Sequence, residues 1–181
     1  SESAIAQSNL LADVRLRIRR GNVEGSNVVV YRNGSRVSTI PIGRSGRLEV
    51  NLEYDSDYIL SFEKDNHVTK KININTKVPS DFNRNRMNFI PFEVELEPQT
   101  DLSAIKVYDN PVGRIRYDAR KGDFDYDTDY SASFQKQVRE EERKLAEEVK
   151  QREIEQERER IAKEAEARRL AEETARKAAE E

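Results

Sequence analysis

The sequence predicts an all-β sandwich of about seven strands with Greek-key connections, followed by a long charged α-helix. Three observations lead to this prediction. Apolar and polar residues alternate in short runs over residues 13–98, turn-forming residues separate these runs, and residues 128–181 contain neither glycine nor proline. Alternation buries one face of an extended segment, whereas a long run without glycine or proline favours a continuous helix.

The predicted strands follow one another at short spacing. In the first, Val14, Leu16 and Ile18 alternate with arginines. The other six runs lie at residues 28–30, 37–40, 48–52, 59–62, 68–74 and 92–96. Asn33-Gly34, between the second and third runs, is a strong hairpin signal, because both central positions of such a turn need a positive φ. Short strands joined by such turns are typical of a sandwich or a barrel.

Composition divides the chain into four segments. We expect a flexible N-terminus over residues 1–12, the sandwich over 13–98, an extended acidic linker or strap over 99–127, and the helix over 128–181. The alternative for the third segment is two further short strands, at residues 105–108 and 112–117. Before the last predicted strand, residues 76–88 are polar and predict a long loop.

The predicted helix is highly charged. From Gln135 to Glu181, 28 of 47 residues are charged, and glutamates often precede a lysine or arginine by four positions. Such pairs stabilise an isolated helix by roughly 0.2–0.5 kcal/mol each. Val138, Leu145 and Val149 begin an apolar seam and are candidate partner-binding residues, but Ile154 lies about 140° away around the helix. Two interpretations stay open: a single solvated helix, and a discontinuous coiled coil through which the chain self-associates.

Four aspartates occupy alternate positions before the helix: Asp123, Asp125, Asp127 and Asp129. Carboxylates at alternate positions can bind one Ca²⁺, as they do in an EF-hand loop. The rest of that loop is absent, because Thr128 stands in place of the required glycine and Phe134 in place of the final glutamate. The competing interpretation is structural: acidic residues favour the positive end of a helix and can cap its first amides. We expect no cofactor, with Ca²⁺ at these carboxylates as the alternative.

Other candidate residues are few. Arg15, Arg17 and Arg19 form a basic row. This row is either a solvated face of an edge strand or a binding site for an anionic partner. His67 is the only histidine and there is no cysteine, so the chain offers little from which to build a zinc site or a catalytic triad. We therefore expect no enzymatic activity and no catalytic residues.

Three segments carry a resemblance to a known family: residues 23–31, 42–50 and 57–62. They contain, in order, a Val-x-Val strand, a turn glycine before an apolar strand, and a Tyr-x-Leu strand. Over residues 13–75 the chain thus resembles the carboxypeptidase regulatory-like domains, which are transthyretin-like or Ig-like sandwiches, and the related PEGA-type modules. It departs from them at Asn66-His67, where the family often has glycine followed by an aromatic residue. With its charged helical tail, the chain is also similar to uncharacterised exported proteins of Bacteroidota.

The resemblance implies a non-catalytic accessory domain. A net charge of −3 with interspersed signs disfavours nucleic acid as a partner, and no apolar run approaches the roughly 20 residues of a membrane span. Ala4 and Ala6 are spaced as at the end of a cleaved export signal, and the alternative is an ordinary frayed terminus. We expect a structural or interaction module with protein partners in the bacterial periplasm or cell envelope. The alternative is an accessory module that binds a glycan or Ca²⁺.

Overall fold

The computed structural model describes residues 9–100, 103 and 105–181 of the chain. The export signal expected at Ala4 and Ala6, and the flexible terminus up to Ser8, lie outside these residues. By its internal contacts the chain divides into two compact units, Ser1–Arg139 and Glu140–Glu181.

A β-sandwich and a long α-helix make up the described residues, so the predicted fold class is confirmed. The elements are β1 (Leu10–Ile18), β2 (Asn27–Arg32), β3 (Ser35–Pro41), β4 (Arg47–Leu52), β5 (Asp57–Glu63), β6 (Lys70–Asn75), β7 (Asn88–Leu96), the 3₁₀ helix η1 (Lys106–Asp109), β8 (Gly113–Asp118), β9 (Asp123–Tyr126) and α1 (Thr128–Ala179). The first strand begins at Leu10 and not at the expected Asp13, because Leu10 is fully buried and pairs with Leu52 of β4.

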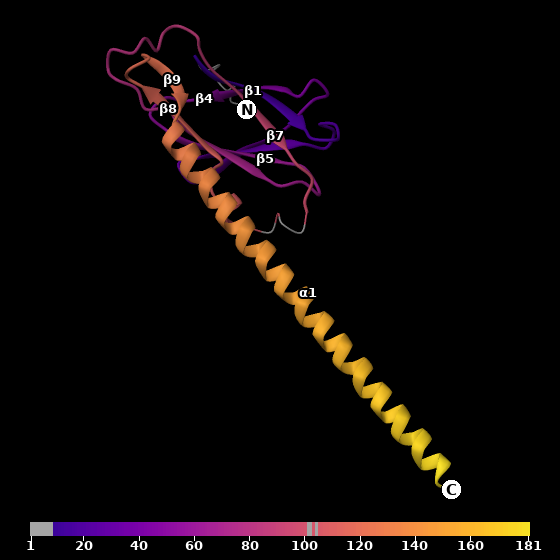
Figure 1. The fold of residues 1–181 in the computed structure, drawn as a ribbon. Coiled ribbons are helices and arrows are strands. Elements are labelled where there is room, and N and C mark those ends of the chain that lie inside the picture. Colours follow the sequence, from indigo (N-terminus) through magenta and orange to yellow (C-terminus); the bar gives the residue numbers. More distant parts are fainter. Residues whose placement is uncertain (1–8, 101–102, 104) are drawn as a thin grey trace. The chain divides into compact units, whose positions relative to one another are not determined.

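The strands form two sheets of unequal size (Figure 1). The smaller sheet has the order β4-β1-β7, in which β1 runs antiparallel to β4 and parallel to β7. The larger sheet has the order β3-β2-β5-β6-β8-β9 and is antiparallel except where β6 meets β8. Both parallel pairs join strands that are distant in the sequence, so no hairpin signal could indicate them.

One apolar core lies between the two sheets. Leu52, Leu60, Phe62 and Ile74 are fully buried within it. The ring of Phe62 meets that of Phe92 edge-on, with 6.3 Å between their centroids. The residues that alternate with these face away from the core, which is the arrangement that the two-residue period predicts.

Two turns depend on backbone conformations that few residues adopt. Between β2 and β3, Asn33 has φ 47° and Gly34 has φ 85°, as the Asn-Gly signal predicts. Gly46 precedes β4 with φ 72°, and a Cβ atom there would lie 2.5 Å from the carbonyl oxygen of Leu16. Only glycine fits this close approach of β1 to the start of β4.

The segment predicted as an acidic linker or strap contributes two strands. Gly113 of β8 pairs with Ile72 of β6, and β9 pairs in turn with β8. Ile115 is 2% exposed and belongs to the core. Burial of this side chain explains why the segment joins the larger sheet. Of the two strands in the alternative, the one at residues 112–117 corresponds to β8, whereas residues 105–108 lie at the 3₁₀ helix η1 and β9 was not predicted as a strand.

The helix α1 begins at Thr128, the residue at which the sequence predicts it. Phe134 and Val138, in the first unit, are buried, and the ring of Phe134 lies 5.9 Å from that of Tyr108. Within Glu140–Glu181, in contrast, no side chain is buried. None of the described helices combines the length and the hydropathy that a membrane crossing requires.

Candidate functional site

The four aspartates of the proposed Ca²⁺ site are spread over a strand and a helix start. Asp123 and Asp125 lie on β9, where Asp125 forms an ion pair with Lys121. Asp127 is the residue before α1, and its Oδ1 accepts a hydrogen bond of 3.1 Å from the amide of Tyr130. This is the bond by which an N-cap residue satisfies the third amide of a helix.

An extended strand explains why these carboxylates do not converge. Alternate side chains of a strand stand about 7 Å apart in a row, whereas a Ca²⁺ loop curls its alternate ligands around one ion. Among the described residues, no group of three or more His, Cys, Asp or Glu side chains could hold a metal ion. The hydrogen bond from Lys121 holds the pKa of Asp125 below its usual range. The structure therefore uses Asp125 in an ion pair and Asp127 as a helix cap.

The arginines of β1 belong to a row of mixed charge and not to a basic surface. β7 lies beside β1 in parallel and places Glu93 opposite Arg15. The guanidinium of Arg17 lies 3.7 Å from the carboxylate of Glu93. Arg19 follows the end of β1, and its amide donates to the carbonyl of Leu96. The pairing of β1 with β7 thus partly neutralises the positive charge expected from the sequence.

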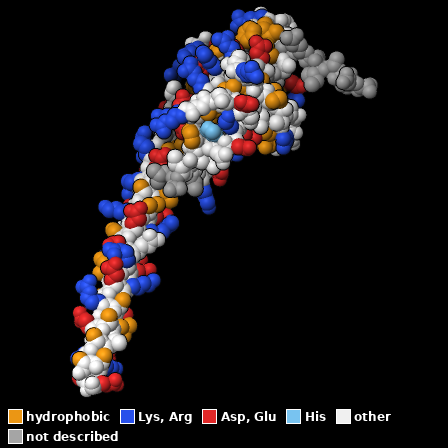
Figure 2. Space-filling model, turned by 90° about the vertical axis from the view of Figure 1, so that its right-hand side faces the viewer, with side chains coloured by type: hydrophobic (Ala, Val, Ile, Leu, Met, Phe, Trp, Pro, Cys, Tyr) orange, Lys and Arg blue, Asp and Glu red, His pale blue; other side chains and the backbone are white. Residues whose placement is uncertain are grey.

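The three apolar helix residues proposed to bind a partner have different environments. Val138 is 7% exposed in the first unit, so it is not accessible to a partner. Leu145 and Val149 lie in the second unit and are half-buried. Figure 2 shows positive and negative side chains mixed with apolar ones over the helix surface. The seam proposed from Val138 onward therefore loses its first residue.

His67 is a turn residue. Its ring Nδ1 lies 2.7 Å from the carbonyl oxygen of Asp65, and its backbone forms an isolated bridge with Pro98. Each of these contacts holds the loop in place.

A cluster of four aromatic rings was not foreseen from the sequence. Phe82, from the loop between β6 and β7, contacts Tyr54, Tyr117 and Phe124, with centroids 6.0, 5.6 and 6.1 Å away. The guanidinium of Arg84 lies over the Tyr54 ring at 5.0 Å. The only sequence signal for this cluster is a single aromatic residue, Phe82, within a mostly polar loop.

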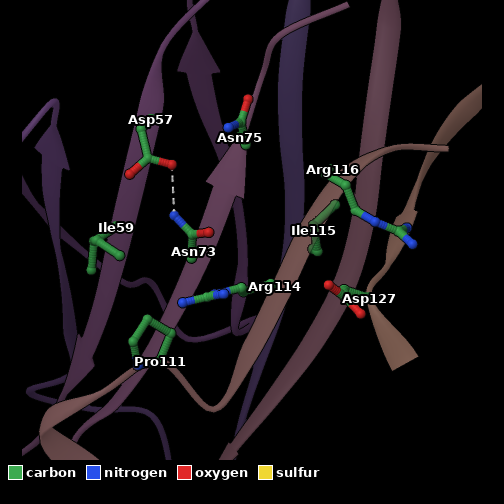
Figure 3. Close-up of a pocket in the computed structure, with 9 residues that line it drawn as sticks. All are labelled: Asp57, Ile59, Asn73, Asn75, Pro111, Arg114, Ile115, Arg116 and Asp127. Atoms are coloured by element: carbon green, nitrogen blue, oxygen red, sulfur yellow. Dashed lines mark hydrogen bonds between the residues drawn. The ribbon is translucent and has the colours of Figure 1, made fainter. Parts of the chain in front are cut away.

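A groove of about 450 Å³, which we call the polar groove, crosses β5, β6 and β8 (Figure 3). Its lining consists of Asp57, Ile59, Asn73, Asn75, Pro111, Arg114, Ile115, Arg116 and Asp127. Most of these residues alternate with core residues along their strands, so the groove lies on the outer face of the larger sheet.

Hydrogen bonds and ring contacts orient the side chains of the polar groove. The Asn73 amide donates to Asp57 Oδ1 at 2.9 Å (Figure 3). Arg114 lies over the ring of Tyr130, with 4.1 Å from its guanidinium carbon to the centroid. The Tyr130 hydroxyl donates to the carbonyl of Pro111 at 2.5 Å, and burial raises the pKa of this tyrosine.

The lining of the polar groove offers both hydrogen-bond donors and hydrogen-bond acceptors. Two amides and two guanidinium groups provide donors, and two carboxylates provide acceptors. The lining contains no histidine, serine or cysteine. A neutral polar ligand with many hydroxyl groups would match this mixture of donors and acceptors.

Comparisons of the chain with family models, with curated proteins and with solved structures find no match. The resemblance to carboxypeptidase regulatory-like domains therefore stays an expectation from the sequence.

Proposed function

We propose that the chain is a non-catalytic structural or interaction module of the bacterial cell envelope. The sandwich docks on a protein partner, and the helix acts as a spacer or as a partner-binding arm. One observation carries this proposal: no side chain of Glu140–Glu181 is buried, although these residues are helical as far as Ala179. At 1.5 Å per residue, a helix of this length reaches about 60 Å.

A helical segment without a fully buried side chain must be stable in water or on a partner. Arg160 illustrates the first possibility, because it pairs with Glu157 at 2.5 Å and with Glu164 at 2.7 Å. Exposed Ile161 and Leu170 offer apolar contacts for the second. The ion pairs suit a helix that acts as a spacer, and the exposed apolar residues suit a helix that binds a partner.

The location and the family are proposed from the sequence alone. The spacing of Ala4 and Ala6 supports export, and the resemblance over residues 13–75 supports an accessory sandwich domain of the carboxypeptidase regulatory-like type. Periplasmic and envelope locations are both compatible with a chain that lacks cysteine.

Site-specific photo-crosslinking tests the proposal. The full chain would carry a photoreactive residue either at Glu153 on the helix or at Phe89, an exposed residue of β7. After irradiation with bacterial envelope fractions, an arm that binds a partner gives a discrete adduct from position 153. A spacer gives an adduct from the sandwich alone. Absence of adducts at several sandwich and helix positions would contradict both forms of the proposal.

The polar groove supports a second candidate, a glycan-binding accessory module. Neutral oligosaccharides of envelope glycans would be titrated into the full chain and followed through amide chemical shifts. Binding in the groove should shift the signals of Asn73 and Asn75 and be lost in Asn75→Ala. Shifts spread over the whole surface, or unaffected by Asn75→Ala, would count against this candidate.

A further inference from the structure

The larger sheet has six strands and the smaller sheet three, so the larger sheet extends past the smaller one at its flanks. At the β8–β9 flank, the β6–β7 loop covers the inner face, because Phe82 packs on Tyr117 and Phe124. The opposite flank, at β3, has a groove of about 420 Å³ in place of such a cover. We call this groove the open flank.

The open flank is apolar on the inside. Its walls include Val30, Val37, Ile40, Val50, Leu52 and Tyr58, which come from β2, β3, β4 and β5. Val37 is 55% exposed. Arg32 and Glu53 pair at 2.6 Å and place charge at the rim.

A β-bulge accounts for the exposure of Val37. In the pairing of β2 with β3, Val30 lies opposite Ser38 and Tyr31 lies opposite Arg36, so Val37 is the extra residue. A bulge of this kind leaves its extra residue unpaired, bends the strand and increases its local twist. The edge of β3 is therefore a poor template for a further strand.

Hydrogen-bonding groups of β4 point into the open flank. The amide of Leu16 donates to the carbonyl oxygen of Gly46 at 2.7 Å. These residues lie one position beyond the Arg15–Arg47 pair that ends the β1–β4 register, so they continue the ladder as a bonded pair. Such pairs alternate in antiparallel strands, so Leu48 and Val50 bond to β1. The backbone groups of Glu49 and Asn51 then face away from β1, along the free edge.

Among the four edge strands in the described part of the chain, β4 is the one that is least protected. β7 contains Pro91, β3 has its bulge and ends at Pro41, and β9 has only four residues with alternating aspartates. β4 is regular over six residues and contains neither proline nor a bulge, and its two charged residues, Arg47 and Glu49, have opposite signs. Proline, bulges, charge and shortness are the features that prevent strand addition.

We propose that the open flank binds an extended segment of another protein, which adds to β4 as a fourth strand of the smaller sheet. This inference rests on the proposed interaction role and names the surface and the class of partner. Alternate side chains of the added strand would be aliphatic and would fill the groove against Val37 and Ile40. The side chains between them would be an acid beside Arg47 and a base beside Glu49, because opposite charges on neighbouring strands attract.

A second copy of the chain fits this surface less well than a single strand. Pairing of β4 with β4 of a second copy would bring the projecting, bulged β3 edges of both larger sheets together. One extended segment avoids that collision and still pairs with the free edge.

Two synthetic peptides test the inference on the full chain. When Val-Glu-Val-Lys-Val-Thr-Val binds parallel to β4, its glutamate lies beside Arg47 and its lysine beside Glu49. The reversed sequence gives the same pairs when it binds antiparallel to β4. Fluorescence anisotropy would measure affinity, and hydrogen exchange would locate the bound segment. We expect one peptide to bind and to slow exchange at the Glu49 and Asn51 amides. An analogue with N-methylated backbone amides should not bind.

Variants of β4 and β3 make the test specific. Glu49→Pro removes an outward amide without breaking a β1–β4 bond and should weaken binding at least about tenfold, since proline is tolerated at such edge positions. Val37→Glu puts a charge into the groove and should weaken binding while leaving the β4 backbone unchanged. Equal melting temperatures would show that each variant folds. The double variant Arg47→Glu and Glu49→Lys should bind the original peptide more weakly. A peptide in which the glutamate and the lysine are exchanged should recover the affinity for this variant.

Several outcomes would overturn the inference: no binding of either peptide at millimolar concentration, binding that survives both Glu49→Pro and Val37→Glu, or protection elsewhere than at β4. A concentration-dependent dimer that Glu49→Pro abolishes would show that a second copy occupies the flank. Adducts from the helix or the rest of the sandwich in the crosslinking experiment would still support the interaction role. The two proposals can therefore fail separately.

Discussion

The ring of Phe82 meets the ring of Tyr117 edge-on, with 5.6 Å between the centroids and 84° between the planes. Edge-to-face pairs of this kind add stability beyond the area that they bury. Phe82 is the only aromatic residue of the β6–β7 loop, and it contacts rings from three other segments. The polar loop is thereby anchored to the β8–β9 flank of the sandwich.

Replacing Phe82 by alanine should destabilise the sandwich by about 2 kcal/mol, because a half-buried ring with three ring partners is lost. Thermal unfolding, followed through near-ultraviolet circular dichroism, should shift downward by roughly 5 °C. Phe89→Ala is the matched control, since Phe89 is 48% exposed and should change the melting temperature little. Equal effects of the two changes would contradict the anchoring role.

Asp127→Ala should remove the N-cap of α1 and cost about 1 kcal/mol, because the Tyr130 amide loses its acceptor. Asp127→Asn should keep most of this stability, since asparagine is an equally good N-cap residue. Chemical denaturation of the full chain compares the two variants. A loss that is as large in the asparagine variant would point to the charge of Asp127 and not to its hydrogen bond.

Removal of Ca²⁺ should leave the melting temperature unchanged, because Asp125 and Asp127 are engaged in an ion pair and a cap. Melting would be recorded with a chelator and with millimolar Ca²⁺. A gain of several degrees on adding Ca²⁺, lost in an Asp125→Asn and Asp127→Asn double variant, would instead establish the metal site.

Acid sensitivity should depend on the pair of Asp55 and Arg84. The hydrogen bond from Arg84 holds the pKa of Asp55 below its ordinary value. A carboxyl whose pKa is lower in the folded state stabilises the fold fully above its unfolded pKa, near about pH 4, and loses this contribution as the pH falls through the folded pKa.

Asp55→Asn should therefore show a smaller fall in melting temperature between about pH 6 and about pH 2.5 than the unchanged chain. Arg84→Gln should have the same effect, and the double variant should add nothing further. Additive effects of the two changes would show that each residue acts through other partners.

Local patterns were enough to predict the seven strands up to Leu96 and the start of α1. The same two-residue period is present in β9, where Asp123 and Asp125 alternate with Phe124 and Tyr126. Because aspartate is rare in strands, the sequence favours helix capping for this run, with Ca²⁺ ligands as the alternative, and does not predict a strand. Phe124 and Tyr126 pack against the core. Their alternation with the aspartates was the sequence signal for a strand.

Surfaces that depend on strand order could not be predicted. Arg15 appears as part of a basic row in the sequence, but the parallel partner β7 brings Glu93 beside it across a long sequence separation. The open flank similarly requires that β3 and β4 lie at the edges of different sheets. Such relationships arise from non-local pairing, which a period of two residues does not specify.

The last prediction concerns a peptide of residues 140–181. It begins after Val138 because that residue is buried in the first unit. The peptide should be largely helical at low salt and lose helix gradually on heating, since exposed ion pairs such as Glu173 with Lys177 are weak and screened by salt. Its helicity, measured by circular dichroism, should not depend on concentration if the helix is a spacer.

A coiled coil would behave differently, because its stability comes from an apolar seam and increases with concentration. Leu145→Ala with Val149→Ala should abolish such a coil, whereas Ile154→Ala, on another face of the helix, is the matched control. Sedimentation of the peptide as a dimer, lost in the first variant and kept in the second, would contradict the single-helix prediction. It would instead identify Glu140–Glu181 as an oligomerisation arm.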